Sequence, residues 1–292
     1  MNYTIKIVDI NDATIDLVLR NLIKKTYGYP DLLPEKYLAL NVQSNASEPS
    51  FFLAAFENDK IIGCNGFLAN DFSLNGRAYV GYQSCWSVTH PDYQGKNVFT
   101  SLVNEAKKIL KQQGAGFLYG IANDISNPII TKKIGFLETP SIVLRIPNIP
   151  FFKQLYFTKK PVLNYNNACI INEEQVKEHK LIQSPSAVKL VKCNDSWLWG
   201  KLILKRKLGL NIPVFYVGGV RLVAEKDLEG LILGIFKMNK ILFVQFFSCE
   251  TNTFNGMLKG WKKAKMNGFI FFNLNMPEFE HFNLMIGPLD VF

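Results

Sequence analysis

The stretch VGYQSCWSVTHPDYQGKNVFTSLVNEAKKIL, residues 80–110, decides how the first half of this chain folds. It reads as a strand over 82–89, a tight loop over 90–96 and a long helix that begins at about Asn97. The helix prediction rests on apolar residues that recur at helical spacing, namely Val98, Leu102, Val103, Ala106, Ile109 and Leu110. Lysines near the helix end suit its dipole, and Gly114 is the expected stop.

The loop before this helix is suited to bind an anion. A strand that turns sharply into a helix leaves backbone N–H groups without partners at the helix start, and the helix dipole also favours negative charge there. Gly95 permits a close approach of the backbone, Gln94 offers a side-chain amide, and Lys96 adds a positive charge. The sequence therefore predicts a diphosphate-binding loop.

Composition places the chain among globular proteins. Its 292 residues suffice for one large domain or two small ones, and 48% of them are hydrophobic. No apolar run reaches the length of a membrane span, and the first residues do not resemble a signal peptide. The five cysteines and three histidines lack metal-ligand spacing, so we expect reduced thiols, a cytoplasmic location and no bound metal.

The net charge of +9 has two explanations. Solvated lysine-rich faces account for it without any partner, whereas a basic site for two anionic substrates would give it a function. The basic clusters LKRK (204–207) and KGWKKAK (259–265) do not form one continuous stripe. Nucleic acid is therefore not an expected partner.

Further elements are predicted on both sides of the central stretch. In the first half they are a strand over 3–7, a helix over 13–25 capped by Asn11 or Asp12, a loop with a short helix over 26–41, a hairpin of strands 51–56 and 60–69, and a strand over 117–122. Prolines and aromatic residues at 140–161 predict a connector and a domain boundary at residue 150.

The second half resembles a faint copy of the first, although the similarity can also arise by chance. It predicts strands over 215–223, 228–237 and 240–247 and a helix over 253–265. GFIFFNLN, which ends at Asn275, then matches GFLYGIAN, which ends at Asn123. The loop before the second helix carries Glu250 and no Gln-Gly-Lys, so only the first half is expected to hold a phosphate site.

The segment THPDYQGKNVFTSLV, residues 89–103, resembles the acyl-CoA pyrophosphate loop of the GNAT superfamily of N-acyltransferases. That loop has Gln or Arg followed by x-x-Gly-x-Gly/Ala. Gln94 matches the first position, whereas Asn97 and Phe99 replace the small residues. Asn97 can still cap a helix or adopt a positive φ, while Phe99 is expected to crowd or reshape the cradle. Residues 117–136 resemble the next strand, the short helix and the Gly-Phe turn of the same fold.

The resemblance implies an α/β (α+β) fold, with a GNAT-like mixed sheet flanked by helices in residues 1–150. A second, degenerate GNAT-like half over 151–292 is expected to contribute to the acceptor site. Acyl-CoA is the implied co-substrate, held by Val88, Thr89, Gln94, Gly95, Lys96, Asn97, Val98, Phe99 and Asn127. The backbone of the first two would pair with the pantetheine arm as a further strand would.

The resemblance leaves the proton-transfer groups open. Thr131 stands where the family has an acidic tyrosine, and the strand that carries Cys85 and Trp86 lacks the carboxylate of many relatives. Asn123 either orients a water molecule or makes a local turn hydrogen bond. We expect Cys85 to be a buried structural thiol, because an amine can attack a thioester directly.

The branch of the superfamily that this loop resembles modifies nucleotide-linked amino sugars for surface polysaccharides. The implied reaction moves an acetyl or short hydroxyacyl group, such as 3-hydroxybutanoyl, to the amine of a dTDP- or UDP-linked amino-deoxysugar. Residues expected to bind that acceptor are Tyr27, Tyr29, Tyr82, Trp86, Trp197 and Lys201. The alternatives are a peptide or protein amine as acceptor, or a non-catalytic acyl-CoA-binding protein. The chain is expected to be a monomer or a homodimer.

Overall fold

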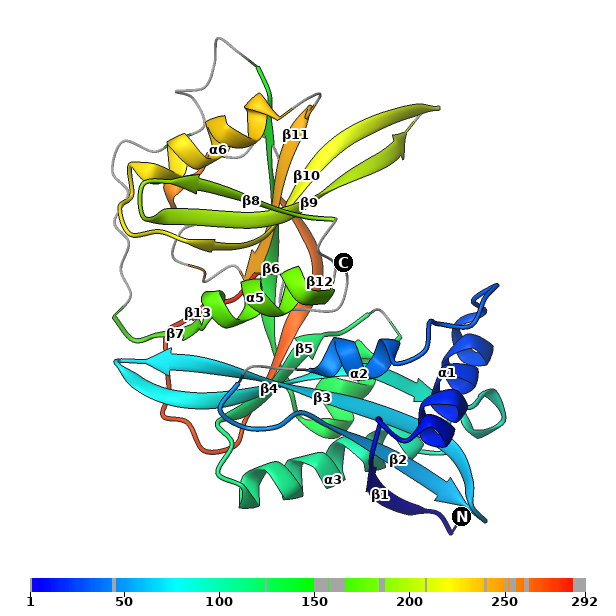
Figure 1. Ribbon diagram of the computed structural model, residues 1–292. Coiled ribbons are helices and arrows are strands. Elements are labelled where there is room, and N and C mark those ends of the chain that lie inside the picture. Colours follow the sequence, from blue (N-terminus) through cyan, green and yellow to red (C-terminus); the bar gives the residue numbers. More distant parts are fainter. Residues whose placement is uncertain are drawn as a thin grey trace. The chain divides into compact units, whose positions relative to one another are not determined.

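In the computed structural model the chain forms two compact units (Figure 1). Unit 1 comprises Met1–Asp71, Tyr79–Glu138 and Ile270–Pro277; unit 2 comprises Phe72–Ala78, Thr139–Phe269 and Glu278–Phe292. The structure describes residues 2–43, 46–123, 125–149, 157, 166–183, 187–207, 209–238, 241–249, 252, 256–259 and 263–285, with only the backbone of 263–267. The predicted boundary at residue 150 lies outside these residues. No helix among them is long and apolar enough to cross a membrane.

Unit 1 is built on a mixed sheet whose strands follow the order β1-β2-β3-β4-β5, with the end of β12 next to β5. The strands are β1 (Thr4–Val8), β2 (Phe51–Glu57), β3 (Lys60–Leu74), β4 (Arg77–Thr89), β5 (Phe117–Ile121) and β12 (Lys263–Asn273). β1 and β3 both run antiparallel to β2, whereas β5 runs parallel to β4. The predicted hairpin, central strand and following strand are confirmed.

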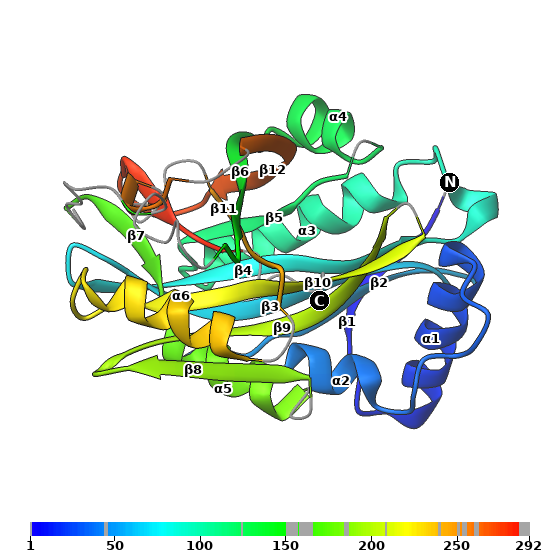
Figure 2. The ribbon, with the colours of Figure 1, turned by 90° about the horizontal axis from the view of Figure 1, so that it is seen from above.

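Helices cover both faces of the unit 1 sheet, as Figure 2 shows. On one face α3 (Val98–Gln112) packs against Leu53 and Ala55, and on the other α1 (Ala13–Tyr27) and α2 (Tyr37–Val42) pack against Phe52 and Ala54. Neighbouring residues of β2 thus serve opposite cores because side chains alternate along a strand. Burial on both faces also explains why the first ten residues after Lys60 in β3 are all buried.

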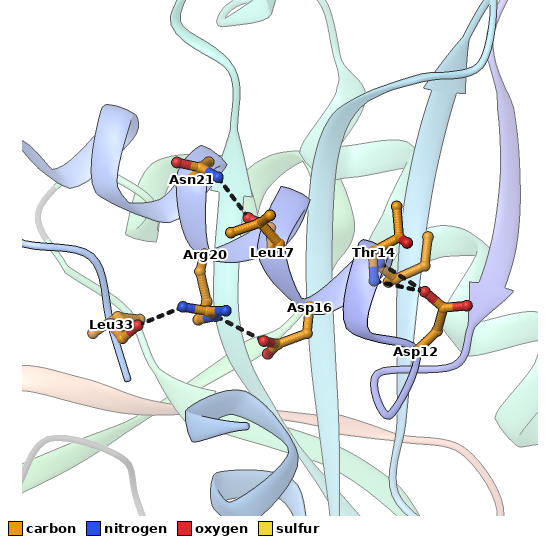
Figure 3. Close-up of polar contacts among 8 residues, drawn as sticks. Asp12, Thr14, Asp16, Leu17, Arg20, Asn21 and Leu33 are labelled. Carbon is orange, nitrogen blue, oxygen red and sulfur yellow. Dashed lines mark hydrogen bonds and ion pairs between the residues drawn. The ribbon is translucent and has the colours of Figure 1, made fainter. Parts of the chain in front are cut away.

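Specific polar contacts fix the start of helix α1 and hold the loop that follows it (Figure 3). Asp12 caps it, because its carboxylate accepts from the backbone N–H groups of Thr14 and Ile15 at 2.8 and 3.1 Å. Inside the helix, Arg20 Nε donates to Asp16 at 2.7 Å and Arg20 Nη1 donates to the carbonyl of Leu33 at 2.8 Å. The Arg20 side chain therefore ties the loop after α1 to the helix itself.

In unit 2 the strands β6-β11-β10-β9-β8 lie side by side in that order. These strands are β6 (Leu137–Pro147), β8 (Val188–Cys193), β9 (Ser196–Lys207), β10 (Leu210–Arg221) and β11 (Phe243–Cys249). Helix α6 (Asp227–Lys237) covers one face, where its leucines and isoleucines meet the apolar residues of β6, β10 and β11. The remaining elements are α5 (Glu173–Gln183) and the short strands β7 (Ala168–Ile171) and β13 (His281–Asn283), which pair in parallel.

Three predictions for the second half are wrong. Residues 227–237 form a helix and not a strand, because Leu228, Leu231, Ile232 and Ile235 recur at helical spacing and are all buried on one side. The expected connector after residue 140 begins with the regular strand β6, whose residues Ser141–Pro147 pair with β11. The helix predicted over 253–265 runs into strand β12 at Lys263; residues 253–255 and 260–262 lie outside the described part.

The mixed α/β class expected from the sequence is confirmed. Within unit 1 the elements match the prediction closely. α1 and α3 begin within one residue of their predicted starts, and the short helix after α1 is α2. The stop after α3 is also confirmed, because Gly114 adopts a left-handed φ of 79°.

Candidate acyl-CoA site

The predicted anion-binding loop lies on the surface at the junction of β4 and α3. The strand ends at Thr89, a single 3₁₀ turn (η1, Pro91–Tyr93) follows, and α3 begins at Val98. Gly95 and Asn97 have left-handed φ angles of 77° and 60°, which turn the chain sharply into the helix. Gln94 to Asn97 are exposed, so the loop can meet a ligand.

The helix start supplies the donors that an anion requires. The N–H groups of Gln94 and Lys96 are already used, since they donate to the carbonyls of Pro91 and Tyr93 at 3.2 and 3.3 Å. The first N–H groups of α3 itself have no partner within the helix, and Asn97 makes no side-chain cap to replace one. The anion site is therefore formed by the amides that follow Asn97, with the side chains of Gln94 and Lys96 beside them.

The Lys96 ammonium is oriented by an aromatic ring. Its Nζ lies 4.9 Å from the centre of the Tyr93 ring, and Lys60 Nζ lies 5.9 Å from the same centre. The Tyr93 hydroxyl donates to Glu57, and this bond raises the pKa of Tyr93. The Tyr93 ring thus has two ammonium groups near it and the Glu57 carboxylate at its hydroxyl, beside the loop.

Close packing holds the N-terminus of α3 against the sheet. At Gly63 an added Cβ would lie 2.7 Å from Val98 Cγ1 and 3.0 Å from the Val88 carbonyl, so only glycine permits this approach. Val98 is buried and reaches a ligand only through its backbone. Phe99 is half-buried and packs against the core on the α3 side.

Strands β4 and β5 separate after a short paired region. Their parallel pairing runs only from Gly81 with Phe117 to Gln83 with Tyr119, while β4 continues to Thr89. The backbone also takes an unusual conformation at Trp86, where φ is 50°. Among the described residues β5 does not pair with β4 beyond Gln83. We name the side of β4 at Ser87 and Thr89 that β5 leaves uncovered the unpaired edge, and an edge of this kind is the feature that a pantetheine arm requires.

The alternation of backbone groups shows which residues face this edge. The N–H of His90 donates to the Ile62 carbonyl of β3 at 2.9 Å, so His90 points toward β3. Because the backbone N–H and C=O groups of successive residues point to opposite sides of a strand, those of Ser87 and Thr89 point away from β3. Their carbonyls accept from α1: the Tyr27 hydroxyl donates to Ser87 at 3.0 Å, and the Thr26 hydroxyl donates to Thr89 at 3.5 Å.

A buried asparagine braces this part of β4, and the sequence provided no signal for it. Asn65, fully buried on β3, donates from Nδ2 to Ser84 Oγ at 3.1 Å. Its Oδ1 accepts from the hydroxyls of Ser84 and Ser87 at 3.2 and 2.8 Å. Both serines belong to the segment of β4 that β5 does not pair with. Asn65 therefore holds this segment against β3.

Two buried polar atoms near the predicted cofactor residues have no hydrogen-bond partner among the described residues. They are the side-chain oxygen Oδ1 of Asn127, at the start of α4 (Asn127–Ile129), and the indole Nε1 of Trp86. The amide nitrogen of Asn127 donates to Glu138 at 3.2 Å, which orients the unpaired oxygen. Buried polar groups normally find partners, so these atoms fit a site that a polar ligand completes.

The residues considered for proton transfer are engaged in local bonds. Asn123 Oδ1 accepts from the N–H groups of Ile125 and Ser126 at 3.1 and 2.8 Å. Asn123 therefore makes the local turn hydrogen bonds that were expected as the alternative to orienting a water molecule. The Thr131 hydroxyl donates to the Asn127 carbonyl at 2.8 Å, one turn back in the chain. Neither side chain has the freedom expected of an acid or a water-orienting group. Their catalytic roles stay predictions that the geometry does not favour.

The six residues expected at the acceptor site differ in accessibility. Tyr27 and Tyr29 are 50% and 40% exposed, with ring centres 5.6 Å apart. Tyr82 is a core residue, 2% exposed, whose hydroxyl donates to the Pro49 carbonyl at 3.3 Å, so its ring cannot stack on a ligand. Trp86 is half-buried against Tyr37. Trp197 and Lys201 lie on β9 of unit 2, where Trp197 is buried beneath Lys177.

The cysteines and histidines have structural surroundings. Cys85 is buried in the core beneath α1 and α2, as expected of a structural thiol. His90 is buried, and burial together with the nearby Lys25 ammonium lowers its pKa, so the ring is neutral in the turn after β4. Within the described ranges, no three His, Cys, Asp or Glu side chains gather as metal ligands would.

Comparison with known proteins defines the class of the first unit. Residues 18–138 match the family model described as "Acetyltransferase (GNAT) domain". The chain therefore carries a GNAT acetyltransferase domain, and the matched region contains the β4–α3 junction, the unpaired edge and the Gly-Phe turn. This domain indicates an acyl-CoA-dependent N-acyltransferase, which confirms the enzyme class predicted from the loop. No curated protein sequence matches the chain.

Solved structures extend the likeness to nearly the whole chain. The fold is similar to Eis1 from Mycobacterium abscessus, with a TM-score of 0.60, 11% identity, and coverage of 94% of this chain and 74% of that one. A GCN5-related N-acetyltransferase from Kribbella flavida gives a TM-score of 0.64 at 10% identity, with coverage of 94% and 72%. A probable N-acyltransferase from Enterococcus faecalis V583 gives 0.59 at 7% identity, with coverage of 94% and 73%. At these identities the likeness concerns the fold.

Proposed function

We propose that this chain transfers an acyl group from acyl-CoA to the amine of a nucleotide-linked amino-deoxysugar. The observation that carries the acyl-CoA part is the adjacency of two features. The unpaired edge of β4 leads through the exposed loop 94–97 to the first amides of α3, which have no partner within the helix. A pantetheine arm on the edge and a diphosphate at the helix start would follow one continuous stretch of backbone, residues 87–99.

In this proposal the chain's residues act mainly by positioning. The amides after Asn97 hold the diphosphate with Gln94 and Lys96, and the edge at Ser87 and Thr89 aligns the arm. The acceptor nitrogen attacks the thioester carbonyl, a C–N bond forms, the C–S bond breaks, and coenzyme A leaves as a thiolate. The proton lost by the amine passes through solvent, because Asn123 and Thr131 are held by local bonds. Orientation of the reactants is then the main source of the rate enhancement.

The choice of acceptor is supported by an aromatic surface beside the unpaired edge. Tyr27 reaches Ser87 through its hydroxyl, yet half of its surface remains exposed next to Tyr29. Two neighbouring rings offer a stacking surface for a nucleobase. The net charge of +9 favours two substrates that each carry a diphosphate. All five cysteines lie in the described part of the chain and none forms a disulfide, which supports the proposed cytoplasmic location.

An acceptor panel tests this assignment. The purified chain is given acetyl-CoA with dTDP- and UDP-linked amino-deoxysugars, and with peptides that carry a free amine, and free thiol is measured as coenzyme A is released. We expect turnover with at least one nucleotide-linked sugar and none with the sugar lacking its amine. Turnover with peptides alone would replace the acceptor by a peptide or protein amine.

A second function, acyl-CoA binding without catalysis, is favoured by one observation. Thr131 stands at the position of the family's tyrosine, and its hydroxyl donates to the Asn127 carbonyl of the preceding turn. This alternative predicts that coenzyme A binds in calorimetry while no amine in the panel is acylated.

A further inference from the structure

Unit 2 holds a cavity of about 660 Å³ that the proposed reaction does not use. We name it the basic groove, and its lining residues are Arg145, Lys205, Arg206, Lys207, Ile212, Val214 and Phe243. They come from four strands that are consecutive in the sheet, β6, β11, β10 and β9. The groove includes the LKRK cluster, which acyl transfer leaves without a role.

Strand register places most of these side chains on one face of the sheet. Lys205 pairs with Ile212, and Val214 pairs with Phe243. One row further along, Tyr216 pairs with Gln245, which pairs with Arg145. Because side chains alternate along each strand, these residues all lie opposite the face that α6 covers. In Figure 1 the β9–β10 hairpin, drawn in yellow-green and yellow, can be followed past the end of β11.

The charge of the groove has a single sign. Four of its seven lining residues are cationic, and no Asp or Glu lines it in the described part of the chain. Two of the cations are positioned by uncharged neighbours. Arg145 Nε donates to Gln245 Oε1 at 2.8 Å, and Lys205 Nζ lies 4.8 Å from the centre of the Tyr216 ring. Neither contact neutralises the charge, so the groove is suited to attract an anion.

The floor between these cations is apolar. Val214 is buried, while Ile212 and Phe243 are half-buried and line the cavity. Inorganic phosphate or a bare sugar phosphate could satisfy the cations but would leave this floor in contact with water. An apolar chain would cover it, at a gain of roughly 25 cal/mol for each Å² removed from water.

We propose that the basic groove binds an anionic amphiphile, whose carboxylate or phosphate meets Arg145, Lys205 and Lys207 and whose apolar chain covers Ile212, Val214 and Phe243. The volume of the groove lies in the range of small-ligand pockets, about 300–1,000 Å³. A single molecule therefore fits it better than a polymer. The site is independent of the acyl-CoA assignment, because it requires nothing from unit 1.

Calorimetry with dodecanoate and dodecyl phosphate, both below their micelle concentrations, tests this proposal. We expect saturable 1:1 binding of both, and at least tenfold weaker binding of uncharged dodecanol and of inorganic phosphate. Lys205→Gln with Lys207→Gln should weaken binding of the anions by about tenfold or more. The matched control is Lys192→Gln with Lys237→Gln, which removes the same charge from exposed sites on β8 and α6 and should leave binding within about twofold.

Several outcomes would overturn the proposal. Equal binding of dodecanol and dodecanoate would show that the cations play no part. An equal loss in both double variants would show that only total charge matters. Sedimentation with vesicles containing phosphatidylglycerol, without binding of the monomeric amphiphiles, would make the face a membrane-contact surface. Circular dichroism of each variant establishes that a loss of binding does not come from unfolding.

Discussion

The Tyr27 hydroxyl donates a 3.0 Å hydrogen bond to the carbonyl of Ser87, on the edge of β4 that β5 leaves unpaired. The two residues are 60 positions apart in the chain. Burial raises the pKa of Tyr27 to about 12, so the hydroxyl stays a neutral donor at physiological pH. The bond therefore occupies an acceptor that a cofactor arm along β4 would also use.

The first prediction is that Tyr27→Phe strengthens binding of coenzyme A by about twofold to fivefold. The substitution frees the Ser87 carbonyl, and a net hydrogen bond is worth about 1 kcal/mol. Calorimetry measures the affinity, and Tyr29→Phe, in the neighbouring ring, is the matched control. A tenfold weaker affinity in Tyr27→Phe would instead make Tyr27 a direct ligand of the cofactor.

The second prediction concerns charge at the start of α3. Lys96→Glu combined with Gln94→Ala should weaken coenzyme A binding by at least about tenfold, because it removes one charged and one polar contact and adds repulsion. Raising the salt concentration should weaken wild-type binding more than that of the variant. Lys111→Glu makes the same charge change at the exposed end of the same helix and should have little effect. Equal losses in both variants would argue against a diphosphate at the loop.

The third prediction concerns the packing of α3. Gly63→Ala places a methyl group 2.7 Å from Val98 Cγ1, so it should lower the free energy of unfolding by about 1–3 kcal/mol and also weaken coenzyme A binding. Val98→Ala removes the opposing methyl groups. We therefore expect the double variant to be more stable than the sum of the single losses by at least about 0.5 kcal/mol in urea unfolding. Strict additivity would show that the two sites do not touch.

The fourth prediction is a pH dependence of stability that arises in unit 2. Burial raises the pKa of Glu173 to about 8, although the Trp199 indole partly offsets the effect. One carboxylate oxygen is buried without a hydrogen-bond partner among the described residues. The folded chain holds this proton more tightly than the unfolded chain. The contribution of Glu173 to the free energy of unfolding should therefore be greatest below about pH 4.5 and should fall as the pH rises to about 8.

Urea unfolding at pH 6 and pH 8 measures this dependence. Glu173→Gln should remove a slope on the order of 1–2 kcal/mol between these values, since each pKa unit corresponds to about 1.4 kcal/mol. Glu178→Gln changes an exposed carboxylate of the same helix and should leave the slope unchanged. The same slope in Glu173→Gln and wild type would assign the pH dependence to other groups.

Local sequence patterns predict several elements of this fold correctly. The apolar spacing from Val98 to Leu110 specifies α3, Gly95 and Asn97 specify the turn before it, and alternation specifies the hairpin of β2 and β3. Such patterns work because a helix or a hairpin depends on neighbours a few residues away. The strand prediction over 228–237 is wrong, because the leucines and isoleucines of α6 have helical spacing.

Contacts between residues far apart in the chain are seen only once the chain is folded. Nothing in the sequence pairs Asn65 with Ser84 and Ser87, or Tyr27 with the Ser87 carbonyl, because these contacts depend on which strands lie side by side. The basic groove likewise combines Arg145 with the cluster around Lys205, which lies 60 residues later in the chain. Long-range contacts are set by packing and strand register, and forming them costs chain entropy. Patterns of neighbouring residues therefore do not predict them.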